Sequence, residues 1–210
     1  MKPLIVINLK TYQQGKSALK LAKIINKVDK NIIIGVQAND IYEIKKTTKL
    51  KLYSQHVDYM MPGRNTGFIL PESIKADGAI GTFLNHSEHR ISFDIIKKTV
   101  TRCKKLNLKT IVFAKDIKEA KKIEKLKPDY IVLEPPELIA GKTSVSEAKP
   151  DLIKNISAAL NPKTKFLVGA GIHSNNDLKI AIKFGASGIA LSSAITTAKN
   201  PEKALRQLLG

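Results

Sequence analysis

Short apolar runs rich in β-branched residues recur along the chain and alternate with longer amphipathic segments. Eight such runs occupy positions 4–8, 31–36, 51–55, 79–84, 108–113, 129–133, 164–168 and 186–191. Each run is nearly continuous in apolar character, which is typical of strands that are covered on both faces. The pattern therefore predicts eight buried strands of a parallel sheet.

Helical periodicity marks several segments between these runs. Apolar residues recur with helical spacing in 17–26, 93–100, 117–124 and 178–184. The segment at 39–45, after the second strand, is expected to be brief. Because no linker or low-complexity stretch divides the chain, the alternation predicts an α/β fold with a single domain over residues 1–210.

Two architectures fit this alternation, a closed (β/α)8 barrel and an open doubly wound sheet. The open sheet usually carries a G-x-G-x-x-G turn after its first strand, whereas this chain has Asn8-Leu-Lys-Thr-Tyr-Gln13 there. The strand count and this difference favour the barrel. Since 210 residues is short for that fold, we expect a short version with trimmed helices.

Charge and cysteine content narrow the classes of function. The formal net charge is +18, from 36 basic and 18 acidic residues, and the lysines are spread over many helical segments. This spread favours a solvated surface over a nucleic-acid-binding arm, and the few aromatic residues argue against a base-stacking platform. The single Cys103 excludes an internal disulfide, and no apolar run is long enough to span a membrane. We expect a cytoplasmic protein without nucleic-acid or membrane partners.

Candidate chemistry lies at the carboxyl ends of the predicted strands, where parallel α/β proteins place their active sites. Two prolines follow Glu134 directly, so the sixth strand must end at that carboxylate. The first strand ends in Asn8 and Lys10, and the fourth ends in a segment that includes His86 and Glu88. A barrel would bring all of these side chains onto one rim.

Small residues end the last two strands, with Gly169-Ala-Gly171 after the seventh and Ser192-Ser193 after the eighth. Their exposed backbone N–H groups are of the kind that hold phosphate at barrel rims. A carboxylate can remove the proton next to a carbonyl, and an imidazole and an ammonium can stabilise the resulting enolate. Together these groups predict an aldose–ketose isomerase for a small phosphorylated sugar.

Two alternative functions stay open at this point. One is another barrel enzyme for a phosphorylated metabolite, such as an aldolase, although Lys165 begins its strand and so lies away from the rim where a Schiff-base lysine is needed. The other is a basic barrel that binds nucleic acid or serves as a scaffold. No cysteine and histidine cluster has metal-ligand spacing, so neither a metal nor another cofactor is expected.

At these residues the chain resembles the triosephosphate isomerase family, most closely its short archaeal-type members, over essentially its whole length. The matching motifs include Val6-Ile-Asn-Leu-Lys-Thr-Tyr12, Asn85-His-Ser-Glu88, Glu134-Pro-Pro-Glu-Leu-Ile139 and Gly169-Ala-Gly-Ile172. The resemblance implies a TIM barrel that interconverts D-glyceraldehyde 3-phosphate and dihydroxyacetone phosphate in glycolysis and gluconeogenesis, without a metal or other cofactor.

The resemblance also implies residue roles. Glu134 would be the proton-transferring base and His86 the electrophile, while Lys10, with Asn8 beside it, would stabilise negative charge and Glu88 would hold Lys10. The residues implied to contact the substrate or its phosphate are Asn8, Lys10, Ile139, Ala140, Gly171, Ser192 and Ser193. The loop at 62–67 resembles a segment that inserts into a neighbouring subunit, which implies a homotetramer or homodimer.

Several positions depart from the family pattern. The tip of the expected lid over 134–146 reads Ala140-Gly141-Lys142, where the family usually has Gly-Thr-Gly. The fifth strand ends in Phe113, where many relatives have cysteine, and this position is expected near the rim, where it could change the packing around Glu134. His173 stands where serine is common, and a structural or surface position is expected for it.

A helical turn is expected to begin directly after His86. The N-terminus of that turn would lower the pKa of the imidazole and so favour its neutral form.

Overall fold

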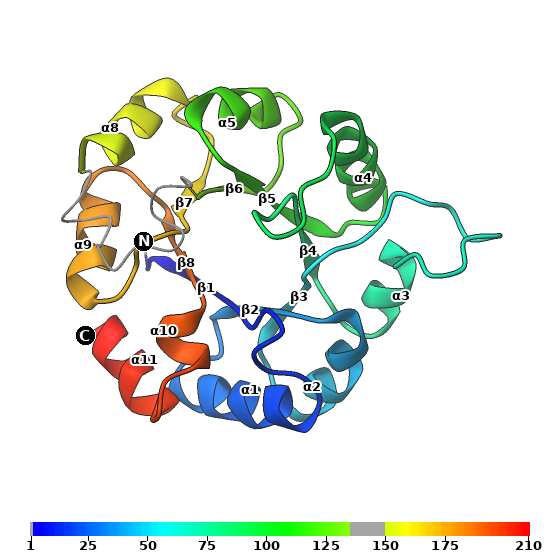
Figure 1. Cartoon of the computed structure of the whole chain (residues 1–210), viewed down its shortest axis with the longest axis horizontal. Helices are drawn as coiled ribbons and strands as arrows, with labels where there is room; N and C mark the ends of the chain where they lie inside the picture. The colour runs from blue at the N-terminus through cyan, green and yellow to red at the C-terminus, as the bar shows by residue number, and fades with distance from the viewer. Residues whose placement is uncertain (1, 135–149) are drawn as a thin grey trace.

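Eight parallel strands close into a barrel in the computed structural model, which describes residues 2–134 and 150–210 (Figure 1). Each strand pairs with the next in chain order, and β1 (Leu4–Asn8) pairs with β8 (Gly188–Leu191) to complete the ring. The strands between them are β2 (Ile33–Val36), β3 (Lys51–Ser54), β4 (Gly81–Leu84), β5 (Lys109–Ala114), β6 (Tyr130–Leu133) and β7 (Phe166–Val168). Every predicted run overlaps an observed strand, so the predicted barrel is confirmed.

Helices surround the barrel and cover the outer face of its strands (Figure 1). They are α1 (Lys16–Val28), α2 (Ile41–Thr47) after the 3-10 turn η1 (Ala38–Asp40), α3 (Pro71–Ala76), α4 (Phe93–Lys105), α5 (Ile117–Glu124), α8 (Pro150–Ala159), α9 (Asn175–Lys183), α10 (Ser193–Thr196) and α11 (Pro201–Leu209). The periodic segments correspond to α1, α4, α5 and α9. None of the described helices is long and apolar enough to cross a membrane.

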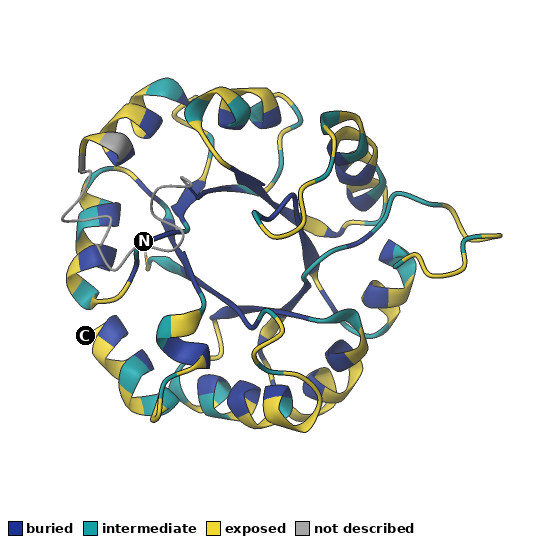
Figure 2. Cartoon of the chain, in the orientation of Figure 1, coloured by how far each residue is buried: buried dark blue, intermediate teal, exposed yellow. Residues whose placement is uncertain are grey.

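Capping residues explain where several helices begin. The side chains of Ser92, Asp116, Ser174 and Asn200 each accept a hydrogen bond from a backbone N–H in the first turn of α4, α5, α9 and α11, respectively. Such caps satisfy donors that have no partner within the helix, and each contributes on the order of 1 kcal/mol. Each of these helices presents its buried residues to the barrel and its exposed residues to solvent (Figure 2).

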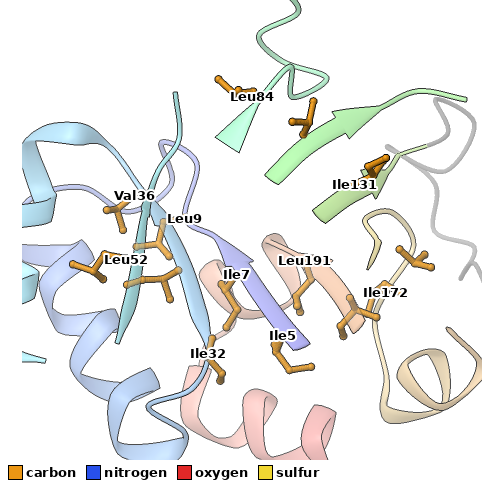
Figure 3. Close-up of a cluster of buried hydrophobic side chains, with 14 of the residues drawn as sticks. Ile5, Ile7, Leu9, Ile32, Val36, Leu52, Leu84, Ile131, Ile172 and Leu191 are labelled. Atoms are coloured by element: carbon orange, nitrogen blue, oxygen red, sulfur yellow. The ribbon is translucent and has the colours of Figure 1, made fainter. Parts of the chain in front are cut away.

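Alternation along the strands divides the apolar side chains into two clusters. The larger cluster fills the layer between strands and helices and includes Ile5, Ile7, Leu52 and Leu191 (Figure 3). The smaller one comprises Val6, Ile33, Tyr53, Phe83, Ile111, Phe113, Val132, Leu167 and Ala190. Since successive side chains of a strand point to opposite faces, this second set fills the barrel interior.

The inward positions continue past the strand ends into polar residues. Two positions beyond the last inward apolar side chains of β1, β6 and β8 stand Asn8, Glu134 and Ser192. All three line one cavity at the carboxyl end of the barrel. The same period of two that packs the interior therefore aims these polar groups at the barrel axis.

Candidate active site

A cavity of about 250 Å³ opens at the carboxyl end of the barrel. It collects residues that are far apart in the sequence, because each strand of a parallel barrel delivers its following loop to the same rim. The predicted site residues that line it are Asn8, Lys10, His86, Glu134, Gly171, Ser192 and Ser193. Glu88 lines an adjoining cavity, whereas Ile139, Ala140 and the rest of the expected lid lie outside the described residues.

Lys10 is held in place by contacts along its whole length. Its backbone has a φ of 48°, in the left-handed region, and its N–H donates to Oδ1 of Asn8 at 3.0 Å. The backbone carbonyl of Lys10 accepts a hydrogen bond from Nε2 of Gln55 at 2.8 Å, and the ammonium of Lys10 lies 2.6 Å from Oε1 of Glu88. A non-glycine residue in this region is strained unless its surroundings stabilise it, so these bonds fix where the ammonium points.

Glu134 follows β6 directly, and its backbone N–H donates to the carbonyl of Ala114 at 2.9 Å. Its side chain is 9% exposed, and Oε2 has no hydrogen-bond partner within the described ranges. Burial raises the pKa of Glu134 to about 7, against the opposing effects of Ser87 and Lys10. A buried carboxyl with a free oxygen and a pKa near neutrality is suited to general base catalysis.

Gly169 makes room for that carboxylate. A Cβ atom at position 169 would lie 2.8 Å from Cγ of Glu134 and would also overlap the side chain of Val132. This glycine was predicted to belong to a phosphate-binding turn, whereas in the structure it has a steric role against the side chain of Glu134. Any larger residue at position 169 would displace Glu134.

His86 faces Glu134 across the cavity, with Nε2 3.6 Å from Oε1 of the carboxylate. Its Nδ1 accepts the backbone N–H of Glu88 at 3.1 Å, so the proton of a neutral ring must sit on Nε2. Burial lowers the pKa of His86 well below its ordinary value of 6.5, although the charge of Glu88 opposes this shift. The imidazole is thus a neutral hydrogen-bond donor directed into the cavity.

The expected helical turn after His86 takes a different form. The backbone N–H of His89 donates to the carbonyl of His86 at 2.9 Å, which closes a turn, but α4 begins only at Phe93. Burial, rather than a helix N-terminus, is the main cause of the lowered pKa of the imidazole. The prediction of a neutral ring therefore rests on a different physical cause from the one expected.

Asn85 anchors the loop that carries His86. Its backbone has a φ of 61°, and its buried side chain donates to the carbonyl of Phe113 at 2.9 Å and accepts the N–H of Ile91 at 3.1 Å. Arg90 donates to the carbonyl of Asn85 at 3.1 Å. The sequence alone indicated no structural role for Asn85, because its partners come from β5 and from the segment that precedes α4.

Small and hydroxyl residues form the opposite end of the cavity. Gly171 has a φ of 67°, and Oγ of Ser192 is buried without a hydrogen-bond partner in the described part of the chain. His173, for which a structural or surface position was expected, is exposed and also lines this end of the cavity. These groups can bind an anion, because backbone N–H groups, hydroxyls and an imidazole can all donate hydrogen bonds.

Gln55 and Ser87 were missed as parts of the site. Gln55 fixes the backbone of Lys10, and Ser87 lines the cavity. Phe113, which was expected near the rim, also lines the cavity, since it lies two residues after the inward-facing Ile111. No group of three or more histidine, cysteine, aspartate or glutamate side chains within residues 2–134 and 150–210 is arranged to hold a metal ion.

Comparison with known proteins gives consistent matches over almost the whole chain. The family model for triosephosphate isomerase matches residues 3–208. The triosephosphate isomerase of Methanocaldococcus jannaschii is 42% identical, with 98% of each chain covered. That of Saccharolobus solfataricus is 40% identical, with 99% of this chain and 95% of the relative covered.

The fold has a close structural counterpart as well. The crystal structure of triosephosphate isomerase from Bartonella henselae superposes with a TM-score of 0.77 and covers 98% of both chains, at 18% identity. At that identity the likeness supports the barrel fold alone, whereas the family model and the archaeal relatives carry the assignment. The chain belongs to the triosephosphate isomerase family.

Proposed function

We propose that Glu134, His86 and Lys10 carry out the reaction of this family in this chain. The enzyme is an aldose–ketose isomerase that interconverts D-glyceraldehyde 3-phosphate and dihydroxyacetone phosphate, a step of glycolysis and gluconeogenesis. The observation that carries the assignment of residues is the buried carboxyl of Glu134, which faces the neutral imidazole of His86 at 3.6 Å. A glutamate base beside a neutral histidine is the arrangement for which the family is well known.

The proton transfer begins at Glu134. Its carboxylate takes a proton from the carbon next to the substrate carbonyl, and the electron pair of that C–H bond moves toward the carbonyl oxygen. The resulting enediolate is negatively charged on oxygen. A proton then passes from the hydroxyl group on the neighbouring carbon to the former carbonyl oxygen, and Glu134 returns its proton to the former carbonyl carbon. The neighbouring carbon becomes the new carbonyl, so that no atom is gained or lost overall.

His86 and Lys10 stabilise the enediolate. The Nε2–H group of His86 donates to the substrate oxygens, and the ammonium of Lys10 provides the positive charge. Glu88 keeps that ammonium oriented through the 2.6 Å ion pair, and Asn8 supports it from the backbone side. These groups are in position before the reaction, so little reorganisation is needed when charge develops.

The phosphate group of the substrate would occupy the end of the cavity formed by Gly171, Ser192 and Ser193. The unpartnered Oγ of Ser192 supports this assignment, because a buried hydroxyl without a partner costs free energy until a ligand accepts its hydrogen bond. The proposed backbone contacts of Ile139 and Ala140 lie outside the described residues. The site must shield the enediolate intermediate from water, because otherwise the intermediate can lose its phosphate group in a side reaction.

A coupled assay with Glu134→Gln tests the role of the base. The amide keeps the shape of the side chain but cannot accept the proton, so kcat should fall about a hundred- to ten-thousandfold. Glu43→Gln, which changes an exposed carboxylate on α2, is the matched control and should keep full activity. Activity retained by Glu134→Gln would refute the assignment.

We infer that the protein is a homo-oligomer, a dimer or a tetramer. The loop between β3 and α3 projects away from the barrel (Figure 1) and contains Met61 and Phe68, which are 64% and 47% exposed. A cavity of about 450 Å³ beside Lys10, lined also by Gln55 and His89, is a fitting site for this loop of a second copy. Exposed apolar residues on a projecting loop favour such an interface.

Light scattering at micromolar concentration tests the oligomer. Phe68→Ser should shift the protein toward monomer, whereas Tyr42→Ser, which removes an exposed aromatic residue from α2, should not. A monomeric wild-type protein would contradict the inference.

We further propose that residues 1–210 form a single domain, which predicts one protease-resistant core. We also propose that the protein works in the cytoplasm.

A further inference from the structure

Phe113 lies directly against the catalytic imidazole. The ring centroids of Phe113 and His86 are 4.8 Å apart, with an angle of 69° between the ring planes. Phe113 is 1% exposed and lines the active-site cavity. This near-perpendicular arrangement is one of the two that aromatic rings prefer, because the positive edge of one ring meets the negative face of the other.

Two further aromatic rings, those of Phe83 and Tyr53, continue the packing from Phe113 into the barrel interior. Phe83 packs against it at 5.5 Å and 69°, and Tyr53 packs against Phe83 at 5.9 Å. A Cβ atom at Gly35 would overlap the ring of Phe83, and one at Gly81 would overlap the ring of Tyr53. The two glycines thus give the rings space inside strands that are otherwise packed with side chains.

The backbone of Phe113 is joined to the same loop. Its carbonyl accepts the side-chain amide of Asn85, the residue immediately before His86, at 2.9 Å. The imidazole is therefore restrained by the ring of Phe113 on one side and by the N–H of Glu88 at its Nδ1. One hydrogen bond alone leaves the ring free to tilt about its side-chain torsions, whereas close packing against a second ring removes that freedom.

We propose that Phe113 is a positioning residue for this isomerase, which holds the imidazole plane of His86 so that Nε2–H points at the substrate oxygens. The proposal rests on the function proposed above for His86. A hydrogen bond to a developing enediolate weakens steeply when the donor turns away, so a small tilt of the ring slows the reaction without preventing substrate binding. The rings of Tyr53, Phe83 and Phe113 form an aromatic column in the barrel interior, and the positioning role belongs to Phe113, the ring of this column that contacts the imidazole.

Matched leucine variants separate positioning from packing. Phe113→Leu removes the ring that touches His86, and Phe83→Leu removes a ring of the same column that does not touch it. Phe113→Leu should lower kcat about fivefold, the rate equivalent of one aromatic pair, with KM nearly unchanged. Phe83→Leu should lower the thermal midpoint to a similar extent but keep most of kcat.

The ¹⁵N signals of the His86 ring give a readout that a merely structural role would not move. In Phe113→Leu the signals should broaden or shift toward a mixture of tautomers, and in Phe83→Leu they should stay at wild-type positions. If Phe113→Leu does not fold, Phe113→Met, which is close in volume, carries the same expectation. Equal kcat for the two variants, or unchanged His86 signals in Phe113→Leu, would overturn the proposal.

His86→Gln distinguishes failure of this proposal from failure of the proposed function. If His86→Gln keeps wild-type kcat, the role of the imidazole is wrong and the positioning role of Phe113 is overturned with it. If His86→Gln is slow but Phe113→Leu is as fast as wild type, His86 keeps its assigned role and only the positioning role of Phe113 is refuted.

Discussion

Nε2 of His86 lies 3.6 Å from Oε1 of Glu134, and each side chain is only 9% exposed. Burial raises the pKa of Glu134 to about 7 and lowers the pKa of His86 well below 6.5. The two shifts are opposite in sign but share one cause, because removal from water disfavours the charged form of either group. The cavity therefore pairs a carboxyl that readily holds a proton with an imidazole that stays neutral.

The pH dependence of the reaction should report the raised pKa of Glu134. Only the carboxylate form can take the substrate proton, so kcat/KM should rise with pH and level off above about 7. The phosphate of the substrate also titrates, near pH 6. Direct ¹³C titration of the Glu134 carboxyl in the free enzyme separates the two, and a midpoint near the ordinary value of 4.5 would contradict the prediction.

The stability of the protein should depend on pH through His86. Below pH 6.5 the unfolded chain protonates this imidazole while the folded protein resists it, so the folded state binds fewer protons and loses stability as the pH falls. The loss amounts to at most about 1.4 kcal/mol for each pH unit. Glu134 acts in the opposite direction, since its raised pKa favours the folded state at low pH.

His86→Gln should therefore lose less stability than the wild type between pH 6.5 and 5 in chemical denaturation. His173→Gln, which changes an exposed histidine at the mouth of the cavity, should follow the wild-type curve. Parallel curves for the wild type and His86→Gln would show that the imidazole is not kept neutral by the fold.

Removing the carboxylate that holds Lys10 should have a measurable but small effect. Glu88 is 58% exposed and the ammonium side chain 21%, so water screens the pair and its contribution is at most about 1 kcal/mol. Glu88→Gln should lower kcat/KM by no more than about fivefold. Glu202→Gln, in an exposed pair on α11, is the control and should leave kinetics unchanged, whereas a thousandfold loss in Glu88→Gln would mean that Glu88 itself takes part in the chemistry.

Gly35→Ala tests whether the glycines give space to the aromatic column. The added methyl group would lie 2.0 Å from Cε2 of Phe83, so the variant should lose about 2–3 kcal/mol of unfolding free energy, the upper part of the usual cost of overpacking. Gly67→Ala is the comparison, because nothing lies within 4 Å of its Cβ position and only its φ of 90° opposes the change. Its cost should be about 1 kcal/mol, and an equal loss in both variants would contradict the steric explanation.

Much of the fold could be predicted because its signals are local. The apolar runs marked the strands, and the prolines after Glu134 marked the end of β6. The polar residues at strand ends were recognised as candidates because parallel barrels collect such ends on one rim. Phe113 was placed only near the rim and Asn85 was given no role in the site. Their roles come from a ring contact between Phe113 and His86 and from a hydrogen bond between Asn85 and Phe113, which join residues far apart in the chain.

By itself the sequence determined the order of strands and helices, the alternation along each strand and the presence of Lys10, His86 and Glu134 at strand ends, because these follow from local pattern and backbone chemistry. Only the tertiary structure decided that β1 closes against β8, that Gly169 lies against the side chain of Glu134, and that His86 is followed by a turn rather than a helix. The pKa shifts of His86 and Glu134 belong to this second group. They depend on how far each group is removed from water, and that is set by side chains from several strands packing around one cavity.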